Sequence, residues 1–384
     1  MDRIYLCLAH MSGKEQQYIQ EAFDTNWVVP LGPNVNAFEE DLAAFVNRTD
    51  HTPLSKEVVA LSAGTAAIHL GLIMLGVGKG DEVICQSFTF AASANPVVYL
   101  GATPVFVDSE VGTYNMDPQL LEEAIKDRIT KTGKKPKAII PVYLYGMPAK
   151  IDEILEIAHH YEIPVLEDAA EGFGSRYKGQ VCGTFGEYGV MSFNGNKMIT
   201  TSGGGALICP NEETKKRVMF YATQAREQFP YYQHEKIGYN YRMSNICAGI
   251  GRGQMTVADE HVKHHQWVHD QYVERLRDVD GIVVHTAPES YMASNYWLST
   301  IRFEDDKHTI GGELLPLIER LSAANIETRP LWKPMHLQPV YKDAPVYVNG
   351  VSEKLFSCGL CLPSGPYVGE KEIDYIVKNI VVDF

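Results

Sequence analysis

The 384-residue sequence lacks the features that mark secreted, membrane-spanning and nucleic-acid-binding proteins. Its seven cysteines, an odd number scattered from Cys7 to Cys361, do not form the even pattern of a disulfide framework. Apolar runs such as residues 139–144 are far shorter than the ~18 residues that cross a bilayer. Residues 1–10 carry an early acid and no sustained apolar core, which argues against a secretory signal. The net charge of −14 disfavours binding to nucleic acids or anionic membranes, and we expect a soluble, cytoplasmic protein.

One cysteine pair, Cys358 and Cys361, has the spacing of a redox or zinc motif. No second pair completes four zinc ligands, and Leu362 and Pro363 continue the segment like the end of a buried strand. We therefore expect reduced thiols in the core and no metal site.

Length and composition indicate a globular chain with a large domain and a smaller one. Hydrophobic residues make up 45% and charged residues 21% of the sequence, which is ordinary for a protein with an ample core. An N-terminal helix is predicted after Ser12, where a capping-box pattern precedes apolar residues at helical spacing. A second helix is predicted around residues 35–45, where Val35, Phe38 and Leu42 share one face.

From residue 58 onward, short apolar runs alternate with helical segments. This alternation predicts an α/β fold with a mostly parallel sheet of about seven strands, buried on both faces. Ligands of such sheets bind beyond the carboxyl ends of the strands. The predicted strands are Val58 to Leu61, Glu82 to Cys85, Val105 to Val107, Ala138 to Val142, Val165 to Glu167, Tyr188 to Phe193 and Ala206 to Cys209.

A single long helix is predicted from Ser244, a plausible N-cap, through Met255 toward Leu276, as the link between two domains. The remainder mixes strands with two helices, which indicates an α+β unit. We expect a large domain over residues 1–255 and a smaller C-terminal domain over residues 256–384.

Lys197 stands in a turn between an apolar strand that ends at Phe193 and a run of three glycines that ends at Gly205. The glycines allow the backbone to approach a ligand closely. A solvated lysine at a strand-turn-strand corner fits this window equally well, so the functional interpretation depends on the rest of the chain.

Polar and aromatic residues follow several other predicted strands. Gly64 and Thr65 open a helix and could bind a phosphate, although an ordinary N-cap is the simpler interpretation of that stretch alone. Phe88 could stack on a flat ring or pack in the core. Asp168 and Glu171 end a strand built to be buried, where an acid is unfavourable unless it faces a cation.

Together with Ser192 and Lys197, these residues match the needs of pyridoxal phosphate (PLP). A lysine amine forms the Schiff base, a carboxylate keeps the pyridine nitrogen protonated, an aromatic ring covers the cofactor, and hydroxyls hold its phosphate. Agreement among so many features favours a PLP site over a set of unrelated coincidences.

The sequence resembles the DegT/DnrJ/EryC1/StrS family of PLP-dependent sugar aminotransferases, which have the aspartate aminotransferase fold (PLP fold type I). The resemblance covers nearly the whole chain and implies that fold and that activity. It is carried by the ordered stretches Pro30 to Glu39, Ser62 to His69, Ser87 to Ala92, Pro104 to Asp108, Leu144 to Gly146, Glu167 to Ala170, Gly183 to Gly186, Ser192 to Lys197, Gly238 to Met243, Arg329-Pro330 with His336, and Cys361 to Ser364.

The resemblance implies a role for each site residue. Lys197 would form the Schiff base, Asp168 would bind the pyridine nitrogen and Phe88 would stack on the ring. The phosphate ligands would be Gly64, Thr65 and Ser192.

Asn240 of the Gly-x-Asn-x-Arg motif would reach the phosphate from the neighbouring subunit, which implies a homodimer with two equivalent sites. A simple loop turn is the alternative for this residue.

Two departures from the common family pattern point to a substrate. Glu171 stands where many members carry Gln or His, and residues 201–205 replace a commoner Thr-Gly-Glu-Gly-Gly. Together with the stretches Asn194 to Lys197 and Glu327 to His336, these features look most like the enzymes of bacillosamine biosynthesis, which use glutamate to aminate C4 of UDP-2-acetamido-2,6-dideoxy-4-keto-glucose. GDP-perosamine synthases are the near alternative, and Glu171 leaves open how the ring hydroxyl of the cofactor is contacted.

Arg329, Lys333 and His336 are the candidates for holding the nucleotide diphosphate or the sugar, with a solvated basic loop as the alternative. Two other functions are considered. A PLP-dependent sugar dehydratase is disfavoured because those relatives replace the Schiff-base lysine with histidine, and a non-enzymatic nucleotide-binding protein would carry no yellow chromophore.

Overall fold

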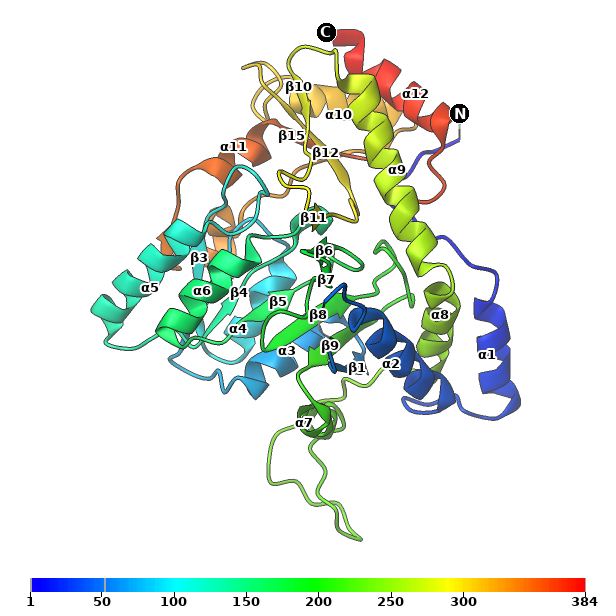
Figure 1. The fold of residues 1–384 in the computed structure, drawn as a ribbon, viewed down its shortest axis with the longest axis vertical. Helices are drawn as coiled ribbons and strands as arrows, with labels where there is room; N and C mark the ends of the chain where they lie inside the picture. The colour runs from blue at the N-terminus through cyan, green and yellow to red at the C-terminus, as the bar shows by residue number, and fades with distance from the viewer. Residues whose placement is uncertain (1, 52, 384) are drawn as a thin grey trace.

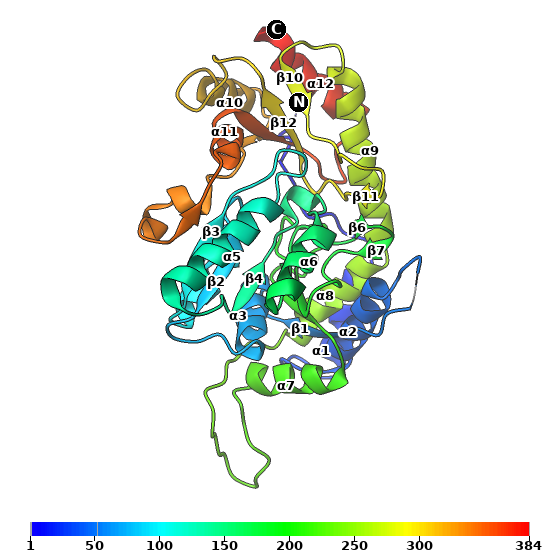
Figure 2. The same cartoon turned by 60° about the vertical axis from the view of Figure 1, so that its left-hand side comes forward.

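The computed structural model describes residues 2–51 and 53–383 and has a large body and a smaller sheet with its own helices (Figure 1). The first and last described segments of the chain lie beside the smaller sheet (Figures 1 and 2). The helices are α1 (Glu15–Asp24), α2 (Pro33–Val46), α3 (Gly64–Met74), α4 (Asn95–Tyr99), α5 (Pro118–Thr132), α6 (Ile151–Tyr161), α7 (Glu212–Ala222), α8 (Asn245–Met255), α9 (Ala258–Leu276), α10 (Leu314–Ala323), α11 (Val351–Cys358) and α12 (Glu370–Ile380).

The main sheet has the strand order β1-β9-β8-β5-β4-β2-β3, and β14 (Val346–Tyr347) pairs with its β3 edge. Parallel bridges from Ile139 to Val165 and from Val142 to Asp168 join β4 to β5. Among the strands that the structure describes in this sheet, β9 alone runs antiparallel to its neighbours, so the prediction of a mostly parallel sheet is confirmed. The strands of this sheet are β1 (Glu57–Leu61), β2 (Glu82–Gln86), β3 (Thr103–Val107), β4 (Ala138–Ile140), β5 (Leu166–Asp168), β8 (Tyr188–Ser192) and β9 (Gly205–Cys209).

Helices cover both faces of this sheet, because alternate residues of a strand point to opposite sides. In β2, Val83 and Cys85 pack with residues of α3 and α4, whereas Ile84 packs with residues of α5 and α6. The apolar runs of the sequence are therefore strands without a solvent face.

The predicted single helix after Ser244 is wrong, because the structure divides it into α8 and α9. The Thr256 N–H and hydroxyl both donate to the Gly253 carbonyl, and Val257 leaves the helical region with φ −123°. Two consecutive β-branched residues after a glycine-rich turn favour such a break. The Ser244 cap itself is confirmed, since its hydroxyl accepts from the Ile246 N–H.

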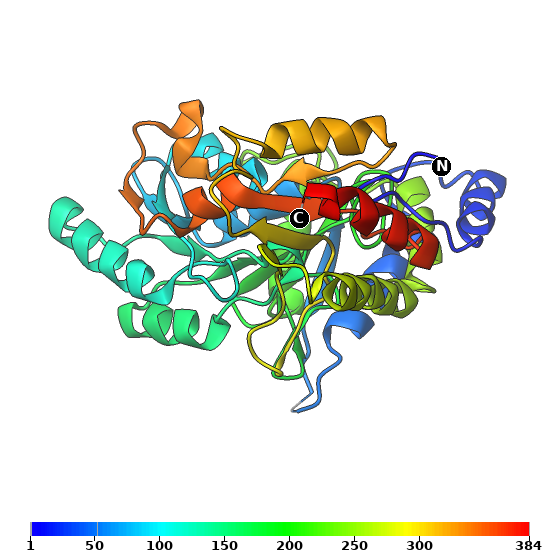
Figure 3. The same ribbon diagram turned by 90° about the horizontal axis from the view of Figure 1, so that it is seen from above.

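The smaller sheet is antiparallel, with the order β10-β12-β15-β13, and α9, α10 and α12 (yellow-green, gold and red) surround it (Figure 3). Cys358 ends α11 and Cys361 lies in β15; both are buried free thiols, as predicted. The strands are β10 (Ile282–Val284), β12 (Ser299–Phe303), β13 (Arg329–Pro330) and β15 (Gly359–Leu362); β6 (Arg176–Tyr177), β7 (Gln180–Val181) and β11 (Met292–Ala293) form a small separate sheet.

The N-terminal segment crosses to the C-terminal part of the chain. Ile4 pairs with Ile326, and the Leu6 N–H donates to the Glu327 carboxylate. The division at residues 255 and 256 stays a prediction, and its outer ends, Met1 and Phe384, lie outside the described residues, as does Thr52. No helix in the described part of the chain is long and apolar enough to cross a membrane.

Candidate active site

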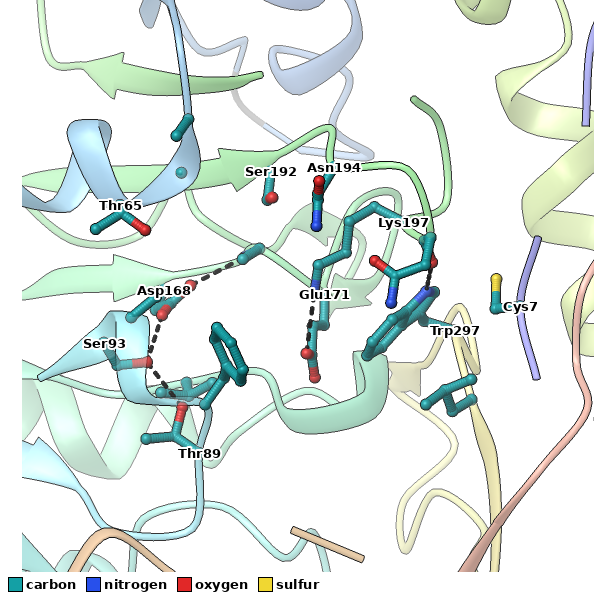
Figure 4. A pocket seen from close by; sticks show the side chains of 18 of the residues that line it. Cys7, Thr65, Thr89, Ser93, Asp168, Glu171, Ser192, Asn194, Lys197 and Trp297 are labelled. Atoms are coloured by element: carbon teal, nitrogen blue, oxygen red, sulfur yellow. Dashed lines mark hydrogen bonds and ion pairs between the residues drawn. The ribbon is translucent and has the colours of Figure 1, made fainter. Parts of the chain in front are cut away.

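A cavity of about 700 Å³ opens at the carboxyl ends of the parallel strands of the main sheet (Figure 4). Residues that follow β1, β2, β5 and β8 line one side of it. The other side is formed by the N-terminal segment at Cys7 and by Trp297, Arg329 and Trp332. The cavity therefore lies where the fold class predicts a ligand, and segments distant in sequence close it.

Lys197 reaches into this cavity from the turn after β8. Its Nζ lies 3.0 Å from the Glu171 Oε1 and 4.0 Å from the ring centroid of Trp297, and its side chain is 13% exposed. The Trp297 indole N–H donates to the Asn196 carbonyl at 2.7 Å, which ties the aromatic wall to the lysine turn. The amine is thus held between a carboxylate and an aromatic face.

Asp168 ends β5 and points into the same cavity beside Ser93 (Figure 4). The Ser93 hydroxyl donates to Oδ2 at 2.6 Å, and the Ala170 N–H donates to Oδ1 at 3.1 Å. Burial raises the pKa of this carboxyl, against the effect of these two hydrogen bonds and of the Lys197 charge. Among the residues that the structure describes, no cation forms an ion pair with Asp168, so the carboxylate is suited to a cationic ligand atom.

Glu171 lies three residues after Asp168, in the loop that follows β5. Its Oε2 accepts from the Tyr145 N–H at 2.7 Å, while Oε1 faces Lys197. Burial raises the pKa of the Glu171 carboxyl, and the Lys197 charge acts in the opposite direction.

The start of α3 forms a tight cradle at the cavity wall. A Cβ added to Gly64 would lie 3.1 Å from the Ser192 Cβ, and one added to Gly205 would lie only 2.3 Å from the Gly64 nitrogen. Glycine at both positions lets the helix N-terminus, the Thr65 hydroxyl and Ser192 meet at one wall. The free N–H groups of a helix N-terminus favour an anion such as a phosphate.

Phe88 does not line the cavity. It is fully buried and meets Tyr145 edge-on, with the ring centroids 6.4 Å apart. Phe90 is 62% exposed and lines the cavity. A tight turn after β2, closed by the Thr89 N–H to the Ser87 carbonyl, separates the two rings, and such a turn cannot be located from strand periodicity.

Of the three predicted substrate residues, only Arg329 lines the cavity, with its guanidinium 3.0 Å from the Glu327 carboxylate. Lys333 is exposed outside the cavity. The His336 ring also lies outside it and is held at both nitrogens, by the Ser87 hydroxyl at 2.6 Å and by Glu353 at 3.1 Å. The structure thus does not support Lys333 and His336 as contacts within this cavity.

Asn240 is exposed and also lies outside the cavity of its own chain. Its backbone pairs with Thr223 at the base of the segment 223–240, here called the arm, which extends away from the body below α7 (Figures 1 and 2). Its role in a neighbouring subunit stays a prediction.

Several residues that line the cavity were not predicted from the sequence. Ser93 lies on a short 3-10 turn after β2, and Trp297, Trp332 and Cys7 come from distant segments. None of them stands in a local pattern of its own, so only the tertiary structure identifies them.

A lysine amine, a buried acid that no cation pairs among the described residues, and an anion cradle line one α/β cavity, which is the arrangement of a PLP-dependent enzyme of fold type I. The chain belongs to the DegT/DnrJ/EryC1/StrS aminotransferase family, whose model matches residues 9–381, and it is a PLP-dependent sugar aminotransferase. The alternative of a non-enzymatic binding protein is thereby wrong.

Named relatives cover almost the whole chain. EpsN of Bacillus subtilis (strain 168), whose assignment as a pyridoxal phosphate-dependent aminotransferase is provisional, is 48% identical over 99% of this chain and 95% of its own. The GDP-perosamine synthase of Escherichia coli O157:H7 is 35% identical over 96% of this chain and 95% of its own. A provisionally assigned sugar aminotransferase of Streptococcus pneumoniae, solved in its PLP form, has a TM-score of 0.89 at 25% identity and covers 99% of this chain and 98% of that chain.

Proposed function

We propose that this enzyme transfers the amino group of glutamate to C4 of a nucleotide-linked 4-keto-6-deoxy sugar, with UDP-2-acetamido-2,6-dideoxy-4-keto-glucose as the acceptor. The observation that carries the proposal is that Lys197 and Asp168, which no cation pairs among the described residues, face one cavity of about 700 Å³. The relation to GDP-perosamine synthase supports a nucleotide-linked sugar and makes a GDP-linked 4-keto sugar the second candidate. A sugar dehydratase is disfavoured because Lys197 is present.

In this proposal each residue acts on the cofactor or the substrate. Bound PLP supplies an electron sink for the carbon that exchanges its amine. Asp168 would hold the pyridine nitrogen, while Gly64, Thr65 and Ser192 would hold the phosphate. Lys197 would attach the cofactor and move the proton at the reacting carbon. Trp297 and Trp332 exclude water from the cavity, and Arg329 binds an anionic part of the substrate at its rim.

We infer that Phe90, and not Phe88, covers the cofactor ring, since Phe90 is the aromatic residue after β2 that faces the cavity. Phe90→Leu is expected to raise the dissociation constant for PLP by about 2-fold to 12-fold, because an aromatic contact contributes roughly 0.5–1.5 kcal/mol. The measurement is a PLP titration of the cofactor-free protein.

The matched control is Phe88→Leu, which makes the same substitution at a phenylalanine that is buried in the core two residues earlier. It is expected to lower the free energy of unfolding by about 1 kcal/mol and to leave PLP affinity unchanged. Weaker PLP binding by Phe88→Leu alone would reverse the assignment.

The homodimer and the contact from Asn240 in trans belong to the same proposal. The arm exposes Tyr231, Tyr232 and Ile237, at 61%, 78% and 81%, and a second copy would cover such apolar side chains. A sedimentation experiment that finds only monomers of the PLP-loaded enzyme would contradict this part.

The substrate is tested by an amine-transfer assay with glutamate and a panel of UDP-, GDP- and dTDP-linked 4-keto sugars. The UDP-linked N-acetylated sugar is expected to give the highest kcat/KM. A higher value with the GDP-linked sugar would select the second candidate, and transfer to none of them would refute the proposed acceptor class.

A further inference from the structure

The Lys197 amine is paired with a carboxylate that can also accept its proton. The Glu171 side chain is only 4% exposed, and its Oε1 lies 3.0 Å from Nζ. The Tyr145 N–H holds the other carboxylate oxygen, and the Asn295 amide donates to the Glu171 backbone carbonyl at 2.8 Å. These contacts fix the carboxylate in front of the amine.

We propose that Glu171 is the proton-accepting partner of Lys197. The proton passes from Nζ to Oε1, so that one N–H bond breaks, one O–H bond forms, and the pair changes from ammonium and carboxylate to amine and carboxylic acid. The net charge of the pair stays zero throughout. The inference rests on the proposed function, because a lysine that moves protons must be able to become neutral inside the closed cavity.

The surroundings favour transfer of the proton between Lys197 and Glu171 over its release to solvent. Burial disfavours a separated pair of charges, and it raises the pKa of Glu171. The neighbouring Asp168 carboxylate also raises the pKa of Glu171, which improves it as an acceptor. On the other side, the Trp297 ring faces Nζ at 4.0 Å and stabilises the charged amine, so neither form is trapped.

The described thiols and the tyrosine hydroxyl near this pair do not compete for the proton near neutral pH. Burial raises the pKa of the Cys7 thiol to about 12 and that of the Tyr145 hydroxyl well above its ordinary value. Burial likewise raises the pKa of the Cys361 thiol. All three remain protonated. Among the described residues, Glu171 is the carboxylate within ion-pair distance of the Lys197 Nζ, and Asp168 forms no ion pair with this amine.

The first test measures the reactivity of the Lys197 amine in cofactor-free protein. Lys197 is acylated with a dilute amine-reactive ester at a series of pH values, and its peptide is quantified by mass spectrometry. Glu171→Gln keeps an acceptor for the Tyr145 N–H but cannot take a proton. It is expected to move the midpoint of the reactivity profile to lower pH by about 1 to 3 units, the range typical of losing one adjacent opposite charge.

The matched control is Glu57→Gln, which removes the carboxylate 3.0 Å from Lys215 in a partly buried ion pair away from the cavity. It is expected to leave the Lys197 profile unchanged. A Glu171→Gln profile that superimposes on the wild-type profile would overturn the proposal. Because no turnover is involved, this result is distinct from a failure of the amine-transfer assay, which tests the proposed function.

A second test measures the protonation of the Glu171 carboxyl and is independent of the reactivity of Lys197. Lys197→Met leaves Glu171 buried without a cation, so its pKa rises further above the ordinary 4.5. The folded protein then keeps a proton that the unfolded chain releases, and stability falls as the pH rises above that value. Urea unfolding between pH 5 and 8 is expected to show an unfolding constant that grows by up to about tenfold per pH unit.

The double variant Lys197→Met/Glu171→Gln is expected to lose this pH dependence. Equal pH dependence in the single and double variants would show that Glu171 does not take up the proton and would refute the proposal. Loss of the dependence in the double variant supports it.

Discussion

Lys197→Ala is expected to abolish amine transfer and to leave the purified protein without the yellow colour of bound PLP. The variant loses the nitrogen that attaches the cofactor and also the base that moves the proton. A single general base contributes about 10²-fold to 10⁴-fold to a rate, so a loss of at least 10⁴-fold is expected when attachment is lost as well. Transfer from glutamate and the visible absorbance spectrum are the two measurements.

Lys215→Ala is the control for this experiment, because it removes a lysine that is also ion-paired, 3.0 Å from Glu57, but lies away from the cavity. It is expected to keep both the colour and the activity. Borohydride reduction of the wild type should fix the cofactor on the peptide that contains Lys197. Normal turnover by Lys197→Ala would end the assignment of this residue.

The arrangement of the main sheet could be predicted because its strands are buried on both faces. Each of the seven predicted strands overlaps an observed one, from Glu57–Leu61 to Gly205–Cys209. A continuous apolar run bounded by turns leaves few alternatives to a buried strand. The residues directly at strand ends, Asp168 and Gly64 among them, followed from the same pattern and do line the cavity.

The prediction was weaker wherever the position depends on a turn or on a contact between distant segments. One tight turn at Ser87–Thr89 decides that Phe90 and not Phe88 faces the cavity. His336 is basic and close in sequence to Arg329, yet its ring is bound by Ser87, which follows β2, and by Glu353. Neither outcome is encoded in local periodicity, because each is set by which elements meet in space.

Asp168→Asn is expected to reduce amine transfer by about 10²-fold to 10³-fold, the usual loss when one electrostatic contact to the reacting system is removed. An amide has the shape of the carboxylate but cannot hold a proton on the pyridine nitrogen. The amide can still be satisfied: its oxygen accepts from the Ala170 N–H, and its NH₂ donates to the Ser93 hydroxyl. The Ser93 hydroxyl then donates to the Thr89 hydroxyl, which lies 2.7 Å away and can act as donor or acceptor.

The same substitution is expected to stabilise the cofactor-free protein at pH 7, because it removes a buried carboxylate that no cation pairs among the described residues. Burial raises the pKa of Asp168 in the folded state, so its contribution to stability is lost as the pH rises above the ordinary value of 3.8. The midpoint of thermal unfolding of cofactor-free Asp168→Asn should therefore exceed that of the cofactor-free wild type at pH 7. The gain should shrink as the pH is lowered toward that value.

Asp108→Asn is the matched control, since Asp108 is also a fully buried acid at a strand end. In the described part of the chain, its two oxygens accept only backbone N–H groups, from Ser109 and Ser352 on one side and from Asn349 and Gly350 on the other. An amide NH₂ would face donors there, so this variant should lose stability and bind PLP as before. Changes in stability of opposite sign for Asp168→Asn and Asp108→Asn would distinguish an acid that serves the chemistry from an acid that stabilises the fold. A less stable Asp168→Asn would show that the carboxylate at position 168 is structural as well.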